Sequence, residues 1–293
     1  MKSKPVMVDG HTVPYALLGH PVSHTLSPVM HNAAFRELGM NAVYLGLDVV
    51  PEKVEATIDV LKSAGFGGLN ITVPLKEMAY QVLGDLDESA QLLGAVNTVQ
   101  FRADGKLIGH NTDGRGFVKA IREEFGTALK GLDVLVVGSG GAGRAVAINC
   151  VREGAANVTI TDVDEIKAHK LVAEIVEKLP GGKVSRINTH SGELVDVSRS
   201  SDLIIHCTPL GMKPKDKPVF SSKYFKKGQM VFDLIYMHPK TVFMKQAMAA
   251  GARTANGLGM LLHQGILAFE IWTGRKPPVA VMKKALEKAV YGR

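Results

Sequence analysis

The sequence predicts an α/β protein with two domains, and three observations support this prediction. Apolar runs of strand length alternate with helical segments along the whole chain, as they do where helices cover a largely parallel sheet. The 293 residues are about twice the ~150 residues of an ordinary domain. The pattern also changes near Asp113, after which strands rich in Val and Ile are separated by longer helices.

The first domain is predicted to begin with a short apolar strand at Tyr15–Gly19 and a helix at Ser27–Gly39. Ser27 suits the N-cap of this helix, Pro28 suits its first position, and the glycine suits its end. Further strands, helices and a hairpin follow, marked by the spacing of apolar residues and by turn residues. They are the strand Ala42–Val49, the helix Pro51–Gly65, the strand Gly67–Thr72, short helices around Leu75–Leu83 and Asp87–Leu93, and hairpin strands at Val96–Phe101 and Lys106–Gly109.

The second domain is predicted to be a parallel sheet with helices on both faces, because buried strands alternate with longer helices. The residue pattern leaves open where the last three helices pack. The predicted elements are the helix Gly114–Phe125, the strand Asp133–Gly138, the helix Gly143–Arg152, the strand Asn157–Asp162, the helix Asp164–Leu179, the strands Val184–Asn188, Leu203–Cys207 and Met230–Leu234, and the helices Thr241–Ala250, Gly259–Thr273 and Val279–Val290.

Composition and charge exclude several classes of protein. With 46% hydrophobic and 22% charged residues, the chain has the composition of a soluble globular protein. The net charge of +7 is spread along the chain, and the densest basic stretch, Lys213–Lys217, is interrupted by Pro and Asp. Nucleic acid is therefore not an expected partner, whereas a diffuse positive charge favours small anionic ligands.

The cysteines and the apolar runs indicate a location in the cell. Cys150 and Cys207 show no metal-binding or disulfide spacing, which fits a reducing cytoplasm. No apolar run approaches the ~18 residues of a membrane span, and the N-terminus lacks the apolar core of a signal peptide. We therefore expect a cytoplasmic protein with no membrane partner.

A glycine-rich loop separates the predicted strand Asp133–Gly138 from the helix that follows it. Such a loop lets a pyrophosphate approach the backbone and meet the N–H groups at the start of the helix. A plain strand-to-helix turn is the alternative, but the strand-loop-helix context favours a Rossmann-like dinucleotide-binding domain. The residues that fit the G-x-G-x-x-G pattern are Gly138, Ser139, Gly140, Gly141, Ala142 and Gly143.

Asp162 ends the next predicted strand, roughly 20 residues beyond the glycine loop, where an acidic side chain accepts hydrogen bonds from the adenine ribose. Its charge would repel a 2′-phosphate, so we predict NAD over NADP as the cofactor. Two alternatives remain: Asp162 caps the next helix, or Lys167 and Lys170 reach a phosphate and permit NADP.

Polar clusters also lie at junctions between elements in the first domain. Lys76 follows a predicted strand, and Asp113 precedes a predicted helix. Taken singly, each cluster is explained by capping or turn formation, but several junctions together indicate a site. A Lys paired with an Asp can transfer the proton when a hydroxyl is oxidised by a nicotinamide.

The sequence resembles the shikimate dehydrogenase family, which includes the quinate/shikimate dehydrogenases. The matching segments follow the family order over nearly the whole chain. They are GHPVSHTLSPVMHN (19–32), GLNITVPLK (68–76), GAVNTV (94–99), GHNTDGRG (109–116), GSGGAGR (138–144), TPLGM (208–212), DLIYMHP (233–239) and NGLGMLLHQG (256–265).

The resemblance implies a reversible, nicotinamide-dependent reduction of 3-dehydroshikimate to shikimate, and oxidation of quinate in some members. It implies that the C-terminal helices return to the first domain. The substrate domain is then 1–112 plus 257–293, the dinucleotide-binding domain is 113–256, and the active site lies in the cleft between them. The implied partner is a small molecule of the shikimate or quinate type. The sequence leaves open whether the protein forms a homodimer.

The resemblance also assigns roles to individual residues. Lys76 and Asp113 match the catalytic pair, and Thr25 and Ser27 match two hydroxyls that hold the substrate carboxylate. No pair of the nearby histidines has metal-ligand spacing, so no metal site is expected. The remaining matches are Thr72, Asn97, Tyr236 and Gln264 for the substrate, and Thr208, Gly257 and Met260 for the cofactor.

Two departures from the family pattern bear on specificity. Thr25 replaces a serine and narrows the pocket, which affects the choice between shikimate and quinate. The stretch after the second nucleotide-domain strand, Thr161–Asp164, lacks the Asn-Arg-Thr turn of NADP-using members, which again favours NAD.

Three alternatives remain on the same architecture. They are a dedicated quinate dehydrogenase, a non-catalytic sensor of a cofactor or metabolite, and a dehydrogenase for a folate or an amino acid. The intact Lys76, Asp113 and Gln264 argue against the sensor. The paired hydroxyls of Thr25 and Ser27 argue against the last alternative.

Overall fold

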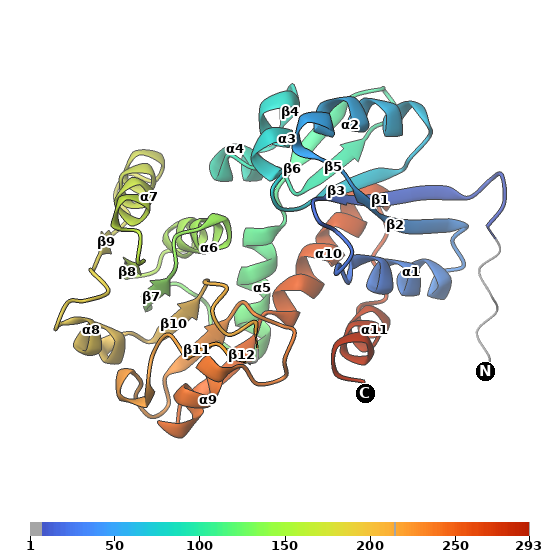
Figure 1. Ribbon diagram of the computed structural model, residues 1–293. Coiled ribbons are helices and arrows are strands. Elements are labelled where there is room, and N and C mark those ends of the chain that lie inside the picture. Colours follow the sequence, from blue (N-terminus) through green and yellow to red (C-terminus); the bar gives the residue numbers. More distant parts are fainter. Residues whose placement is uncertain (1–7, 214, 293) are drawn as a thin grey trace. The chain divides into compact units, whose positions relative to one another are not determined.

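The computed structural model (Figure 1) describes residues 8–213 and 215–292, which form two compact units. The first unit comprises the chain up to Asp113 and from Gln264 onward, and the second unit is Gly114–His263. The chain enters the second unit at the start of α5 (Asp113–Phe125) and leaves it within α10 (Leu258–Thr273). Residues 1–7, which begin the N-terminal segment predicted to lack a signal peptide, lie outside the described residues.

The first unit contains a six-stranded mixed sheet in the order β2-β1-β3-β5-β6-β4. The strand β1 is parallel to both its neighbours, β2 and β3, whereas β5 is antiparallel to β3 and β6. The predicted hairpin is therefore confirmed as the pair β5 and β6. The strands are β1 (Val13–Gly19), β2 (Ala42–Asp48), β3 (Gly68–Ile71), β4 (Asp85–Leu86), β5 (Thr98–Phe101) and β6 (Leu107–His110).

Helices cover both faces of this sheet. Leu18 and Ile71 pack on one face with Ile58 of α2 and Ala79 of α3. On the other face, α1 and the C-terminal part of α10 form an aromatic cluster with the sheet, and α11 packs against α1. The helices are α1 (Ser27–Glu37), α2 (Val54–Ser63) after the 3₁₀ turn Pro51–Lys53, α3 (Lys76–Val82), α4 (Glu88–Leu93) and α11 (Val279–Tyr291).

The prediction that Ser27 caps α1 is wrong by one residue. Leu26 occupies the N-cap position without a side-chain cap, and Ser27 is the first helical residue. The main-chain N–H of Ser27 donates to the hydroxyl oxygen of Thr25, at 3.3 Å. The local sequence holds hydroxyls at both positions, and Thr25 rather than Ser27 takes an N–H group at the start of the helix.

The second unit is a six-stranded sheet in the order β12-β11-β10-β7-β8-β9, with every pair parallel, which confirms the predicted Rossmann-like architecture. The strands are β7 (Asp133–Val137), β8 (Asn157–Thr161), β9 (Val184–Arg186), β10 (Leu203–His206), β11 (Met230–Asp233) and β12 (Arg253–Asn256). The chain order reverses between β7 and β10. The carboxyl ends of these two strands therefore form the topological switch point at which such sheets bind ligands.

Helices flank this second sheet as well. On one face, Phe243 of α9 and Leu194 of α8 pack against Val137 and Val231. On the other face, the ring of Phe117 in α5 meets Phe232 edge-on, with ring centroids 5.8 Å apart. The helices are α5, α6 (Gly141–Arg152), α7 (Glu165–Lys178), α8 (Leu194–Ser200) and α9 (Val242–Ala249), with a 3₁₀ turn at Ser222–Tyr224.

The sequence did not predict β4, α8, β12 or the 3₁₀ turn Ser222–Tyr224. The β12 segment, Arg253–Asn256, has no apolar alternation, and it forms a strand because β11 supplies a parallel partner from Met230 to Asp233. Pairing with a neighbour far along the chain is invisible to a local pattern. In the described part of the chain, no helix combines the length and the apolar character needed to cross a membrane.

His31 of α1 is fully buried, and its two ring nitrogens have no hydrogen-bond partner among the described residues. Its ring stacks on Tyr44 with centroids 4.5 Å apart, and Phe269 of α10 stacks on it as well. Burial lowers the pKa of His31 to about 3, because a charged imidazolium in this aromatic surrounding would lack both water and a counter-ion.

We predict that this histidine makes the first unit sensitive to acid. In the unfolded chain, His31 has a pKa near ~6.5, so the unfolded state binds more protons as pH falls from about 6.5 toward 3. The free energy of unfolding should fall by about 1.4 kcal/mol per pH unit in this window on account of His31 alone. His31→Phe should remove that slope, as measured by urea unfolding between pH 7 and pH 4.

The matched control is His190→Phe, at an exposed histidine. Carboxylates titrate equally in all three proteins, so only the difference between the variants is informative. Equal pH slopes for the wild type and His31→Phe would contradict the assignment.

Candidate functional site

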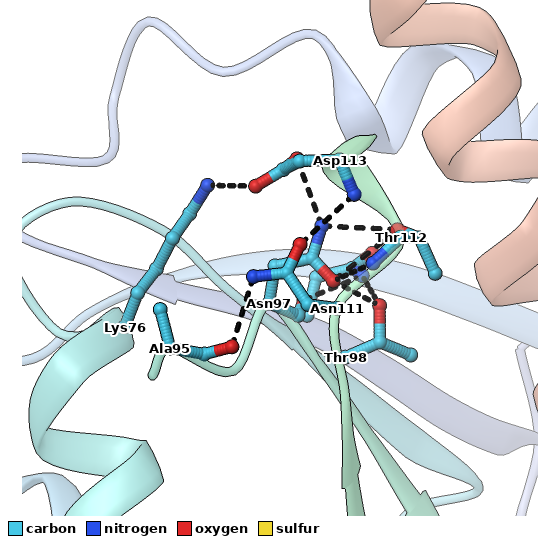
Figure 2. A network of polar contacts seen from close by, with 8 residues as sticks. Lys76, Ala95, Asn97, Thr98, Asn111, Thr112 and Asp113 are labelled. Atoms are coloured by element: carbon cyan, nitrogen blue, oxygen red, sulfur yellow. Dashed lines mark hydrogen bonds and ion pairs between the residues drawn. The ribbon is translucent and has the colours of Figure 1, made fainter. Parts of the chain in front are cut away.

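Lys76 and Asp113 form a close ion pair in the first unit, with Nζ 2.6 Å from Oδ2 (Figure 2). Lys76 is the first residue of α3, and Asp113 is the first residue of α5. The main-chain carbonyl of Lys76 accepts the N–H of Val96, at 2.9 Å, which ties the start of α3 to the segment before β5. The two side chains keep 27% and 16% of their surface exposed, so the pair is partly buried and still open to a small molecule.

Asn97 fixes the second oxygen of Asp113. The main-chain N–H of Thr112 donates to Asn97 Oδ1 at 2.8 Å, and because an N–H group can only donate, this contact identifies the oxygen of the amide. The amide nitrogen therefore faces Asp113 and donates to Oδ1 at 2.9 Å. Each oxygen of the carboxylate thus has one donor, Asn97 on one side and Lys76 on the other.

A chain of buried hydrogen bonds leads from Asn97 to Ser27. Thr98 donates its hydroxyl to Asn97 Oδ1 at 2.9 Å and accepts from Asn70 Nδ2 at 3.0 Å. Tyr44 donates its hydroxyl to Asn70 Oδ1 at 2.7 Å, and its oxygen accepts from the hydroxyl of Ser27. Burial raises the pKa of Tyr44 well above its ordinary value, against the opposing effect of the Ser27 hydrogen bond, so Tyr44 acts as a neutral donor. Every donor in the chain points from Ser27 toward Asp113.

The other residues predicted for the substrate lie in both units. Thr25 packs its methyl group against Gly46 of β2, where an added Cβ would stand 3.4 Å away. Thr72 is half-buried between β3 and α3, and Gln264 is buried in α10. Tyr236 belongs to the second unit, where it follows β11, and burial raises its pKa.

The glycine loop lies between β7 and α6, at the carboxyl end of β7. Gly138 has a φ of +105°, and a Cβ at Gly143 would stand 1.9 Å from the carbonyl oxygen of Gly138. The backbone itself therefore requires these two glycines. A Cβ at Gly140 or Gly141 would meet no atom within 4 Å, so the chain leaves open space there. That space adjoins the start of α6, which no side chain caps, and main-chain N–H groups at the start of a helix are suited to bind a phosphate.

Asp162 directly follows β8, and its carboxylate binds the glycine loop. Oδ2 accepts the main-chain N–H of Ser139 at 2.6 Å and its hydroxyl at 2.7 Å, and Oδ1 accepts the N–H of Asp164 at 2.9 Å. Burial raises the pKa of Asp162, but these hydrogen bonds outweigh it and the pKa is lowered. Asp164, and not Asp162, caps α7 through the N–H of Lys167, and Lys167 Nζ lies 3.4 Å from the same carboxylate.

The remaining residues predicted for the cofactor belong to the second unit. The Thr208 methyl group would lie 2.9 Å from a Cβ on Gly138, so the Thr208 turn packs directly on the glycine loop. Gly257 approaches the carbonyl oxygen of Leu234 so closely that a Cβ would stand 2.0 Å from it, and Met260 is a half-buried residue of α10. Gly257 is therefore required by the backbone, whatever its role toward a cofactor.

Sequence reasoning missed the polar residues that hold the predicted site in place. The sequence patterns assigned roles to other residues in the segments that contain Asn70, Thr98 and Thr112. These three residues are buried next to Asn97, which the sequence alone does not reveal. His206 and Asp233 were also missed, because each lies in an apolar strand that reads as core. Among the described residues, no group of three or more His, Cys, Asp and Glu side chains could hold a metal ion.

The fold and these residues define an enzyme of the NAD(P)-dependent alcohol dehydrogenase class. A parallel sheet carries a glycine loop at its switch point, and a separate unit carries a Lys-Asp pair suited to proton transfer.

Comparison with known proteins identifies the family. Residues 17–99 match the shikimate dehydrogenase substrate binding domain, and residues 257–287 match the shikimate 5′-dehydrogenase C-terminal domain. A protein of Methanopyrus kandleri named shikimate dehydrogenase (NADP(+)) is 43% identical over 96% of this chain and 97% of its own. This chain belongs to the shikimate dehydrogenase family.

Solved structures agree with this assignment. A shikimate dehydrogenase in complex with NADP⁺ is 40% identical, with a TM-score of 0.89 over 97% of this chain and 98% of its own. A shikimate 5-dehydrogenase from Listeria monocytogenes in complex with shikimate and NAD is 33% identical, with a TM-score of 0.89 over 95% of this chain and 98% of its own.

The glycine loop gives a prediction that separates folding from binding. Gly140→Ala should leave the melting temperature nearly unchanged but weaken dinucleotide binding at least about tenfold, because the methyl group meets no protein atom and enters the open space proposed for the pyrophosphate. Gly143→Ala should instead lower the melting temperature by several degrees, because the methyl group meets the Gly138 carbonyl. Thermal unfolding and fluorescence titration with NADH check both. Equal behaviour of the two variants would refute this division of roles.

Proposed function

We propose that this enzyme catalyses the reversible reduction of 3-dehydroshikimate to shikimate, with NAD as its preferred cofactor. The contact of Lys76 with Asp113 carries the proposal, because it joins a proton-transferring group to a carboxylate at a partly exposed position. Asn97 supports it by fixing the direction of the carboxylate. The hydroxyls of Thr25 and Ser27 lie in the same unit and suit a carboxylate substrate.

In the proposed mechanism, Lys76 exchanges the proton of the reacting oxygen. When shikimate is oxidised, the lone pair of an uncharged Lys76 amine takes the hydroxyl proton as the C–H bond breaks, and in the reverse direction the Lys76 ammonium returns a proton to the ketone oxygen. The nicotinamide of bound NAD(P) supplies the hydride acceptor or donor. Asp113 accepts an N–H of Lys76 and thereby holds Nζ in place, while Asn97 keeps the carboxylate from rotating.

The proposed carboxylate site lies at the start of α1. Thr25 and Ser27 would donate their hydroxyls to the substrate carboxylate, which would lie at the positive end of the α1 dipole. Because the Ser27 hydroxyl also reaches Tyr44, a bound carboxylate would take over a donor that the buried chain uses in the free enzyme. Thr72, Tyr236 and Gln264 are proposed to contact the rest of the substrate.

The preference for NAD rests on Asp162. Its carboxylate sits at the end of β8 against Ser139 of the glycine loop, where it can accept hydrogen bonds from ribose hydroxyls and would repel a 2′-phosphate. Gly138, Gly140, Gly141, Ala142 and Gly143 are proposed to hold the pyrophosphate, with Thr208, Gly257 and Met260 nearer the nicotinamide. The Methanopyrus kandleri protein is named for NADP(+), so this proposal sets the present chain apart from that relative. Lys167, the nearest lysine after Asp162, already pairs with Asp164.

Quinate is the second candidate substrate, and Thr25 is the observation that favours testing it. Its methyl group occupies space next to Gly46 of β2 that a serine would leave open. The shape at the carboxylate end of the proposed pocket therefore differs from that of a family member with serine.

Removal of the Lys76 amine tests the mechanism. Lys76→Ala should lower kcat with shikimate by at least ~10², because general acid–base catalysis contributes about that much, and it should leave dinucleotide affinity unchanged. Steady-state absorbance at 340 nm and NADH titration measure the two quantities. Lys62→Ala, at an exposed lysine of α2, is the control and should match the wild type. An undiminished kcat in Lys76→Ala would remove this residue from the mechanism.

Kinetics with shikimate and quinate, each with NAD and NADP, test the choice of cofactor and substrate. The wild type should favour NAD with either substrate. Asp162→Asn should raise kcat/KM with NADP relative to NAD on the order of tenfold, because it removes a like charge from the position of the 2′-phosphate. Asp164→Asn removes a charge two residues away and keeps a good N-cap, so it should change the ratio little. Equal wild-type efficiency with both cofactors would show that Asp162 does not discriminate.

A further inference from the structure

His206 and Asp233 form a fully buried pair that the proposed chemistry does not use. They end the neighbouring parallel strands β10 and β11 and lie opposite each other in the register of the sheet. Both side chains have 0% of their surface exposed, and Nδ1 of the histidine lies 2.9 Å from Oδ1 of the aspartate. A buried acid–base pair of this kind is costly unless every polar atom has a partner, so its remaining contacts matter.

The contacts of Asp233 determine which ring nitrogen of His206 carries the proton. Thr241 accepts the N–H of Met244 at 3.1 Å, so its own proton is directed to Asp233 Oδ2 at 2.5 Å. The N–H of Ile235 donates to Oδ1 at 3.1 Å. The carboxylate therefore accepts on both oxygens, and Nδ1 of His206 carries the proton that it donates to Oδ1.

The other ring nitrogen of His206 faces Thr208. Nε2 lies 2.6 Å from the Thr208 hydroxyl oxygen, and in the neutral imidazole this nitrogen accepts the hydroxyl proton. The same oxygen accepts the N–H of Leu210 at 3.3 Å and keeps one lone pair for a further donor. Phe243 stacks on the imidazole with centroids 4.5 Å apart and 20° between planes, which holds the ring in this orientation.

Thr208 lies at the switch point of the sheet. It follows β10, whose neighbour β7 leads into the glycine loop, and its methyl group would be 2.9 Å from a Cβ on Gly138. The carbonyl carbon of Cys207 would be 3.1 Å from the same Cβ. The Thr208 turn and the first glycine of the loop are therefore packed together at the place where a parallel sheet of this order binds its ligand.

We propose that His206 and Asp233 are positioning residues for the dinucleotide. Acting through Thr208, they hold its turn against the glycine loop and keep the hydroxyl oxygen as an acceptor. The group that it would accept is a donor of the dinucleotide, either a ribose hydroxyl or the carboxamide N–H. This inference rests on the NAD(P)-dependent class of the enzyme and is independent of the proposed substrate.

A double-mutant cycle on dinucleotide affinity tests the inference. Thr208→Val removes the hydroxyl and keeps the shape, and His206→Phe removes the ring nitrogens and keeps an aromatic ring on Phe243. Each should raise the Kd for NADH about tenfold, as the loss of one hydrogen bond of ordinary strength would. Because His206 acts through Thr208, the double variant should bind no more than about twofold weaker than either single variant. Fluorescence titration without substrate measures the four constants.

Two controls separate positioning from a purely structural role. Thr208→Ser keeps the hydroxyl and loses the methyl group, and it should bind NADH within about twofold of the wild type. If packing of the methyl group were what matters, Thr208→Ser would bind weakly and Thr208→Val would bind like the wild type. Thermal unfolding checks that each variant is folded. If His206→Phe does not fold, the same cycle is run with His206→Asn, which can keep a donor at the position of Nδ1 for Asp233 but ends one bond before the position of Nε2 that faces Thr208.

The outcomes distinguish this inference from the proposed function. Additive effects of the two substitutions, or an unchanged Kd in the folded His206 variant, would overturn the positioning role whatever the substrate is. Absence of shikimate turnover in the wild type would overturn the proposed function and would leave the cycle on NADH affinity intact.

Discussion

The hydrogen bond from the Thr112 main chain to Asn97 Oδ1 decides the direction of the polar network in the first unit. Because a main-chain N–H only donates, it sets which end of the Asn97 amide faces Asp113. The same donor-to-acceptor sense then continues through Thr98 and Asn70 to Tyr44, all of them buried. The amine of Lys76 is the one cation in this chain of contacts, and it stands at the end that small molecules can reach.

In the second unit, the proposed binding site is positioned mainly by the backbone and less by a side-chain network. The reversal of strand order between β7 and β10 creates the place for a ligand, and the glycine loop and the Thr208 turn meet there. Asp162 fastens the loop from the side of β8 through Ser139. In this unit, Asp162 binds the glycine loop directly, and Thr208 packs against it. His206 contacts the loop only through Thr208.

Much of this arrangement follows from local sequence, and the exceptions have a common cause. The buried Val- and Ile-rich runs predicted the central parallel strands, and residues at junctions such as Lys76 and Asp113 were found because polar groups stand out there. The strand β12 could not be predicted, because its pairing with β11 and not its own composition makes it a strand. His206 was hidden for a related reason: its polar partner Asp233 lies on another strand, 27 residues along the chain. The cap at α1 was misplaced because Thr25 and Ser27 both carry hydroxyls, and only the geometry tells which one receives the N–H.

The close approach of Gly143 to the Gly138 carbonyl affects how the G-x-G-x-x-G pattern should be interpreted. A lineage that stopped using a dinucleotide would still be obliged to keep glycine at both of these positions, since any side chain there collides with the chain itself. Gly140 and Gly141 face no such obligation and would be free to drift. In distant descendants of this fold, the middle of the motif is therefore the informative part, and its outer glycines record only that the loop is still folded.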